Sequence, residues 1–211
     1  MNNTNIMNIT KDKTLIILDW DDTLFPTTWI TTNNINIKNG ITNRNIINYF
    51  NLVDKELYKL LSKLMSYGTV IIITNAMLNW ISISVTLLDQ TSSLLRLNKE
   101  STAPILVISA REAYGTNPDP NEWKKKTFID VVQQYYNDKN NIVSIGDAEY
   151  EYIALINLHV KTRHNYRLLK SVKFIKYPTR DLLLDQIKVM TKASKQVCLK
   201  PTHLDLKFDT K

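Results

Sequence analysis

The sequence is poor in the residues that build disulfide frameworks and zinc sites. It has one cysteine, Cys198, so no internal disulfide can form, and its three histidines do not have zinc-ligand spacing. We therefore expect a reducing, intracellular and cytoplasmic setting. The chain also lacks a basic segment followed by a long apolar run near its start, and no stretch approaches the ~20 apolar residues that cross a bilayer. Neither secretion nor a membrane span is expected.

The length and composition suit one domain. The chain has 211 residues, of which 44% are hydrophobic, and this is enough to build one sizeable core. We predict a flexible N-terminal tail over residues 1–12, a single α/β domain over 13–196 and a C-terminal tail over 197–211.

The net charge of +7 is unevenly distributed along the chain. Residues 161–200 hold eleven Lys and Arg against two Asp, which leaves a net +9 in this region. A basic region of this kind attracts anionic partners, so contact with a nucleic acid or an anionic lipid is one interpretation. The other is that these lysines form the solvated faces of helices.

Apolar runs alternate with segments of helical periodicity. This alternation predicts a doubly wound, Rossmann-like parallel sheet of about five strands, because parallel strands need crossover connections. The predicted strands cover residues 14–19, 69–75, 104–109, 140–147 and, more weakly, 172–177. The predicted helices cover residues 42–67, 77–97, 121–137, a short segment to 157, and 179–196.

Polar residues stand where three of these strands end. Asp19 and Asp21 follow the first strand, Thr74 and Asn75 the second, and Asp147 the fourth. These residues can converge only if the sheet winds outward in two directions from the first strand, which creates a crevice at the carboxyl ends of the strands. We expect a functional site there.

The pair Asp19 and Asp21 indicates the chemistry of that site. Two carboxylates this close repel each other unless a cation or a shared proton compensates them, so the pair suggests a divalent metal or an acid/base division of labour. Asp19 could attack an electrophilic phosphorus, and Asp21 could protonate the departing oxygen and then activate water. The alternative is a surface turn that caps the next segment.

Other residues could complete the site. A carboxylate nucleophile and a phosphate need a nearby cation, for which Lys124 is our choice, although Lys125 or Lys126 could serve. Arg111 could contact a substrate phosphate or pair with a loop acid. Asp147 and Glu151 lie one helical turn apart, and such oxygen ligands suit Mg²⁺, although acids are also common at helix N-termini. Asn75 and Arg111 are the predicted substrate-binding residues.

With these residues in place, the sequence resembles the haloacid dehalogenase (HAD) superfamily over about residues 13–180. Asp19-Trp-Asp21-Asp-Thr23 is similar to its first motif, Thr74 to the second, Lys124 to the third, and Gly146-Asp147 with Glu151 to the fourth. The resemblance implies Mg²⁺ bound by Asp19, the Asp21 backbone carbonyl and Asp147. It further implies that Asp19 is phosphorylated in turnover, that Asp21 is the general acid/base and that Glu151 supports the site.

The sequence departs from the family pattern at two positions. Asp22 stands where many members have Gly, and Glu151 where Asp is common. The detailed pattern is similar to an uncharacterised, capless group within the superfamily, since neither gap between motifs has room for a large cap domain.

The function expected from this resemblance is a Mg²⁺-dependent phosphomonoester phosphatase. By family analogy an open site suits phosphate on something large, so we expect a phosphorylated macromolecule or another anionic substrate. Two alternatives stay open. One is a phosphatase that processes nucleic-acid ends, and the other is a catalytically silent module that binds a phosphorylated ligand.

Overall fold

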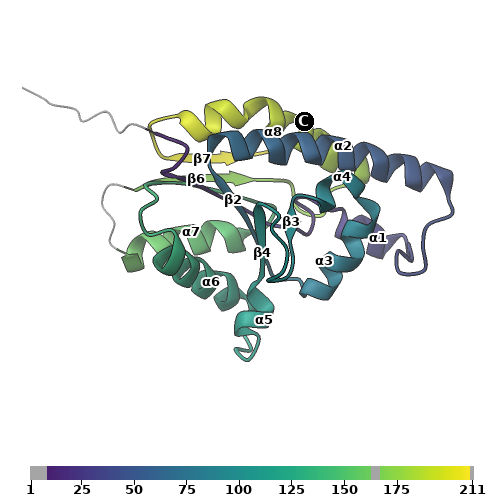
Figure 1. Cartoon of the computed structure of the whole chain (residues 1–211), viewed down its shortest axis with the longest axis horizontal. Helices are drawn as coiled ribbons and strands as arrows, with labels where there is room; N and C mark the ends of the chain where they lie inside the picture. The colour runs from purple at the N-terminus through teal and green to yellow at the C-terminus, as the bar shows by residue number, and fades with distance from the viewer. Residues whose placement is uncertain (1–8, 163–166, 210–211) are drawn as a thin grey trace, which may run out of the picture.

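The computed structural model describes residues 9–162 and 167–209. In this part of the chain one seven-stranded, all-parallel sheet lies between two layers of helices (Figure 1). The strands are β1 (Thr14–Leu18), β2 (Thr69–Thr74), β3 (Leu95–Arg96), β4 (Ile105–Ser109), β5 (Asn141–Gly146), β6 (Leu168–Lys173) and β7 (Leu204–Lys207).

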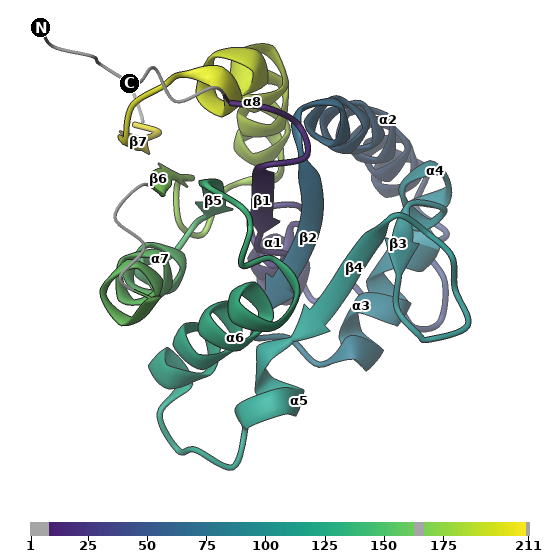
Figure 2. The same ribbon diagram turned by 60° about the vertical axis from the view of Figure 1, so that its left-hand side comes forward.

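The helices cover both faces of the sheet, as Figure 2 shows. They are α1 (Thr27–Thr32), α2 (Arg44–Tyr67), α3 (Leu78–Ser84), a 3₁₀ turn η1 (Val85–Leu87), α4 (Asp89–Ser92), α5 (Ala110–Tyr114), α6 (Pro120–Tyr135), α7 (Glu149–Thr162) and α8 (Arg180–Leu199). Side chains of a strand alternate between faces. Ile16 and Leu18 of β1 therefore pack in the core under α2 and α8, whereas Leu15 and Ile17 pack in the core under α6 and α7. Every β1 residue is buried, which explains its continuous apolar run.

The strand order is β3-β4-β2-β1-β5-β6-β7, so the chain winds outward from β1 in both directions. β1 pairs with β2 on one side and with β5 on the other. The predicted α/β class and parallel sheet are confirmed. Because β1, β2 and β5 are neighbours, the polar residues that follow them reach the same edge of the sheet.

The predicted strand count of five is too low. One strand was missed because residues 77–97, predicted as one helix, divide into α3, η1, α4 and the two-residue β3. Leu88 leaves helical geometry at φ −133° and ψ 70°. The buried carboxylate of Asp54, on α2, then accepts the N–H groups of Gln90 and Thr91 at 2.8 Å each and starts α4. A cap supplied by a distant helix leaves no local signal.

The C-terminal part of the fold also differs from the prediction. β6 covers Leu168–Lys173 rather than 172–177, because its lysines interrupt the apolar pattern by which a strand is recognised. The predicted tail over 197–211 contains the end of α8 and all of β7. β7 is held by its parallel pairing with β6 and by the contact of Phe208 with Phe174, whose ring centroids are 4.9 Å apart.

Two further segments complete the fold. The polar stretch 26–41 contains the short helix α1. Residues 1–8 of the predicted N-terminal tail lie outside the described residues. In the rest of that tail, the Thr10 carbonyl accepts a 2.7 Å hydrogen bond from the Thr14 hydroxyl at the start of β1. Within residues 9–162 and 167–209, none of the helices combines the length and the apolar character needed to cross a membrane.

Candidate functional site

The chain leaves β1 through a tight turn that presents Asp19. The Asp19 N–H donates to the Ile145 carbonyl at 2.9 Å, so the residue after β1 stays tied to β5. The next side chain, Trp20, is fully buried, and its indole N–H donates to the Ser84 hydroxyl at 3.1 Å. The Trp20 carbonyl accepts the Leu24 N–H at 2.9 Å, which closes the turn. The buried indole therefore anchors the turn that carries Asp19.

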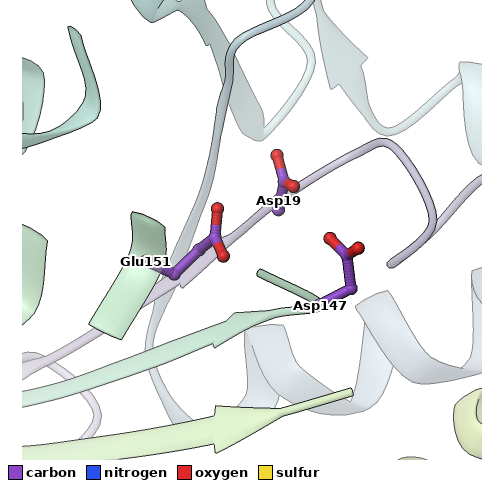
Figure 3. A group of neighbouring side chains, drawn as sticks. All are labelled: Asp19, Asp147 and Glu151. Carbon is purple, nitrogen blue, oxygen red and sulfur yellow. The ribbon is translucent and has the colours of Figure 1, made fainter. Parts of the chain in front are cut away.

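Three carboxylates meet at the carboxyl ends of β1 and β5 (Figure 3). Asp19 follows β1, Asp147 follows β5, and Glu151 comes from the first turn of α7. Each offers an oxygen, and these oxygens lie within 4.8 Å of one another. The three residues are only 4–6% exposed. Buried carboxylates this close repel each other strongly unless positive charge compensates them.

Lys124 supplies part of that positive charge. It projects from α6, is 1% exposed, and places its Nζ 2.7 Å from Asp19 Oδ1 and in contact with Glu151 Oε1. Burial by itself lowers the pKa of Lys124, but the carboxylates of Asp19 and Glu151 outweigh it and raise the pKa above its ordinary value. The ammonium group therefore stays charged between two acids.

The neighbouring lysines point elsewhere. Lys125 pairs with Glu122 on the same helix at 2.6 Å, and Lys126 is exposed with its Nζ 5.9 Å from the centre of the Tyr114 ring. Successive residues of a helix project in different directions, so only one of three consecutive lysines can face the carboxylates. The structure places Lys124 in that position.

Gly146 leaves room for Glu151. A Cβ atom at position 146 would lie 2.3 Å from the Glu151 Cγ, a separation that real Cβ atoms do not show. The Glu151 side chain folds back over this glycine and accepts the Ala148 N–H on Oε2 at 3.2 Å. Its other oxygen contacts Lys124. A side chain at position 146 would therefore displace Glu151 from this position beside Lys124.

Asp21 lies beside this cluster with its own partners. The Trp80 indole N–H donates to Asp21 Oδ1 at 2.9 Å, and the Thr27 hydroxyl donates to the same oxygen. Burial and the nearby charge of Asp19 nevertheless raise the pKa of Asp21 to about 6. A carboxyl group with such a pKa can both give and take a proton near neutral pH.

Asp147 is perturbed more strongly. Burial, followed by the charges of Asp19 and Glu151, raises its pKa to about 8. The Thr23 hydroxyl lies 3.5 Å from Asp147 Oδ1, a long and weak hydrogen bond. The charged form of Asp147 is therefore poorly compensated by the protein's own groups.

The donor set fits a divalent cation. Asp19 Oδ1 lies 2.7 Å from the Lys124 ammonium group, and one lysine stands against three buried carboxylates. A hard cation bound to carboxylate oxygens would reduce their mutual repulsion and favour the charged form of Asp147. No backbone N–H in the described part of the chain donates to the Asp21 carbonyl, so that oxygen is also available. Asp19, Asp147 and Glu151 together could hold a metal ion, and Lys124 also contacts Asp19 and Glu151.

The remaining predicted site residues lie around this centre. Thr74 is fully buried at the end of β2, and its hydroxyl accepts the Ala76 N–H at 3.0 Å. Asn75 is half-buried, and its Nδ2 lies 3.5 Å from the Pro120 carbonyl. The exposed Arg111 stacks on Trp123, with its guanidinium 5.6 Å from the ring centre. The structure thus brings Arg111 to an aromatic ring rather than to the carboxylates or to a loop acid.

The Asp22 side chain contacts helix α1. Its backbone adopts φ +54°, in the left-handed region that favours glycine and that Asp tolerates better than most residues. Its carboxylate turns to α1, where it accepts the Thr28 N–H at 2.8 Å and contacts the Thr28 hydroxyl. Asp22 therefore positions α1.

Three residues of the site were not predicted as such. Thr23 reaches Asp147, and Thr27 and Trp80 both donate to Asp21. Thr23 and Thr27 follow Asp21 closely in the sequence, so their hydroxyls were available as a signal. Trp80 has no local signal, because its contact joins residues 59 positions apart.

Comparisons of the chain with protein-family models, with curated proteins and with solved structures find no match.

Proposed function

We propose that this protein is a Mg²⁺-dependent phosphomonoester phosphatase that works through a phosphorylated Asp19. One observation carries the proposal: the buried Asp19 carboxylate lies between a buried lysine and a buried acid, Lys124 and Asp147, at the carboxyl ends of central strands. This is the arrangement that a carboxylate nucleophile and an anionic substrate require, because both need positive charge. The family resemblance of the motifs is the second support.

Asp19, Asp147 and the Asp21 carbonyl would hold the Mg²⁺. Bound there, the ion would neutralise charge on the transferring phosphoryl oxygens and orient them. Lys124 already neutralises one side of Asp19 and also pairs with Glu151. Two cations would then offset a dianionic phosphate beside a carboxylate.

The reaction has two steps on this chain. In the first, an Asp19 oxygen bonds to phosphorus, the phosphorus–oxygen bond to the leaving group breaks, and Asp21 gives that oxygen a proton. In the second, Asp21 takes a proton from water, the water oxygen bonds to phosphorus, and the bond to Asp19 breaks to release inorganic phosphate. The hydrogen bonds from Trp80 and Thr27 occupy one Asp21 oxygen, which leaves the other for proton transfer.

The inserts near the site are small, which favours a large or exposed substrate. Between β1 and α2 the chain contains only the six-residue helix α1 and a loop. By analogy with capless phosphatases, a site of this kind accepts phosphate on a macromolecule.

The described residues of the basic region 161–200 do not form one surface around the site. Lys192, Lys195 and Lys200 line a hollow at the C-terminal end of α8. This end lies beside the start of β5, since Asn141 Nδ2 donates to the Cys198 carbonyl at 3.0 Å. It is therefore at the edge of the sheet opposite to Asp147. Lys176 is nearer to the site, since Lys173, three residues before it, pairs with Gly146, the residue before Asp147. Lys176 is the better candidate for contact with a substrate phosphate.

The test is hydrolysis of an aryl phosphate with Mg²⁺ by the wild-type chain and by Asp19→Asn. We expect the variant to lose at least about 10³-fold in kcat/KM, because it removes the nucleophile. Asp21→Asn should slow the second step, so that acid quenching traps phosphate on Asp19 and mass spectrometry of the Asp19 peptide detects it. The matched control is Asp130→Asn, which changes an acid of α6 that contacts Tyr114 instead.

The outcomes separate the alternatives. Full turnover by Asp19→Asn would exclude the proposed mechanism. No hydrolysis of any phosphate by the folded, Mg²⁺-loaded wild type would favour a silent module that binds a phosphorylated ligand. Turnover restricted to 3′- or 5′-phosphorylated oligonucleotides, falling steeply with salt, would favour processing of nucleic-acid ends.

A further inference from the structure

β7 is the strand at one edge of the sheet, and no strand in the described part of the chain pairs with its outer side. Leu204–Lys207 pair with β6 on one side, at the end of the strand order. Asp205 and Lys207 are exposed, and Leu206 is 41% exposed. An edge strand with free backbone groups is a template for pairing with another strand. Figure 2 shows β7 at the margin of the sheet, next to β6.

The backbone direction identifies the residues that are free to pair. The Phe208 N–H donates to the Lys173 carbonyl of β6 at 2.9 Å. Backbone groups of alternate residues point to the same side of a strand, so those of Leu206 also face β6. The N–H and C=O groups of Asp205 and Lys207 therefore face outward, to the side on which no described strand pairs with β7.

The sequence of this edge is complementary to itself. If two copies pair antiparallel about Leu206, Asp205 of each copy stands opposite Lys207 of the other. Residues with outward backbone groups then face each other, so these two pairs each exchange two hydrogen bonds. Leu206 stands opposite its own copy, and Leu204 stands opposite Phe208. The charged pairs lie on one face of the joined sheet and the apolar pairs on the other.

Neighbouring registers lack this complementarity. Pairing about Asp205 would place two aspartates opposite each other, and pairing about Lys207 would place two lysines opposite each other. Like charges directly opposite are destabilising, whereas opposite charges stabilise the pair.

We propose that the β7 edge binds a second copy of this chain, joining two sheets by antiparallel pairing about Leu206. The exposed apolar Leu206 and the self-complementary charges both favour this occupant over an unrelated strand. The antiparallel arrangement points the carboxyl ends of the two sheets in opposite directions. The two carboxylate sites would therefore lie at opposite ends of the dimer and stay accessible.

The test is sedimentation equilibrium of the full chain from about 1 µM to about 1 mM, a range in which small interfaces dissociate. We expect a concentration-dependent monomer–dimer equilibrium. Asp205→Lys places two pairs of lysines at the interface and should raise the dimer Kd by about tenfold or more, and Lys207→Asp should do the same with aspartates. The double variant D205K/K207D restores opposite charges and should dimerise like the wild type.

A mixture makes the test sharper. Asp205→Lys and Lys207→Asp, each impaired alone, should form a heterodimer when mixed in equal amounts, because every charged pair is then opposite in sign. Glu100→Lys and Lys99→Asp change the net charge equally at exposed positions beyond β3 and should leave the equilibrium unchanged. Lys207→Pro removes an outward N–H and should also impair dimerisation.

Thermal melting of each variant separates loss of pairing from loss of folding. A wild type that is monomeric throughout this range would overturn the proposal. Single charge reversals that dimerise as well as the wild type, or a double variant that stays monomeric while folded, would also overturn it.

Discussion

Two buried lysines at opposite ends of the sheet show how the same side chain can serve different purposes. Lys124 and Lys170 are at most 1% exposed. Lys124 meets two carboxylates, those of Asp19 and Glu151. Lys170 of β6 instead donates to the Cys198 carbonyl at 2.7 Å, in the last turn of α8. The first lysine compensates acids at the candidate site, and the second caps a helix.

The difference appears in their pKa values. Burial lowers the pKa of both lysines. At Lys124 the two carboxylates outweigh burial, so its pKa is raised, whereas Lys170 faces a neutral carbonyl and its pKa falls to about 8. Burial alone therefore does not distinguish a candidate catalytic lysine from a structural one. The charge of its partners does.

Within this comparison of the two lysines, the largest expected effect is that of Lys124→Met on turnover of an aryl phosphate. We expect kcat/KM to fall by about 10²–10³-fold, since the lysine compensates charge in a site sheltered from water. Because Asp19 and Glu151 are left without their cation, the variant should also lose about 3–5 kcal/mol of stability. Activity should be measured below its melting temperature. If a folded Lys124→Met kept wild-type turnover, Lys124 would have only a structural role, as Lys170 does.

The second prediction concerns pH and the carboxylate end of the sheet. Asp147 has an ordinary pKa of 3.8, which is raised to about 8 in the fold. Between these two pH values the folded state holds a proton that the unfolded chain has lost. The melting temperature of the metal-free protein should therefore decrease as the pH rises from 4 to 8. Asp147→Asn should flatten this dependence. Mg²⁺ should stabilise the wild type at the alkaline end but not Asp147→Asn, and equal stabilisation of both would contradict the metal assignment.

The third prediction concerns the other lysine. Lys170→Met should leave kcat/KM unchanged and alter the free energy of unfolding by about 1 kcal/mol or less, because Asn141 still donates to the Cys198 carbonyl. The penalty for burying the charged lysine is full below pH 8 and is relieved as pH rises from about 8 to 10.5. Denaturant unfolding should therefore show the wild type gaining stability relative to Lys170→Met over that window. If the wild type instead lost stability relative to Lys170→Met as the pH rises, the fold would stabilise the charged form of Lys170.

The smallest expected effect is that of Trp80→Phe. Its indole hydrogen bond favours the charged form of Asp21 and so lowers a pKa that burial raises to about 6. Without it the pKa of Asp21 should rise, and the pH profile of kcat/KM should shift to higher pH with a modest change in the maximum rate. Trp123→Phe is the matched control, because its indole donates to the Asn117 carbonyl instead. Identical profiles for wild type and Trp80→Phe would show that the hydrogen bond does not tune Asp21.

Sequence reasoning was most successful where the signal is local. The apolar run of β1 followed by Asp19 and Asp21 predicted both a buried strand and the edge at which its acids lie. It was weakest where a contact joins distant segments, as in the cap from Asp54 that divides the predicted helix at 77–97. It also missed β7, because an apolar–polar alternation over only four residues is too short to stand out from its surroundings.

The sequence by itself determined the alternation of strands and helices and the placement of acids after β1 and β5, because hydrophobic periodicity is written in neighbouring residues. Only the tertiary structure decided which of three consecutive lysines meets Asp19, that Glu151 turns to that lysine, and that Trp80 binds Asp21. These contacts depend on how α6, α7 and α3 pack against the sheet. Packing is set by the whole core at once, so no short stretch of sequence encodes it.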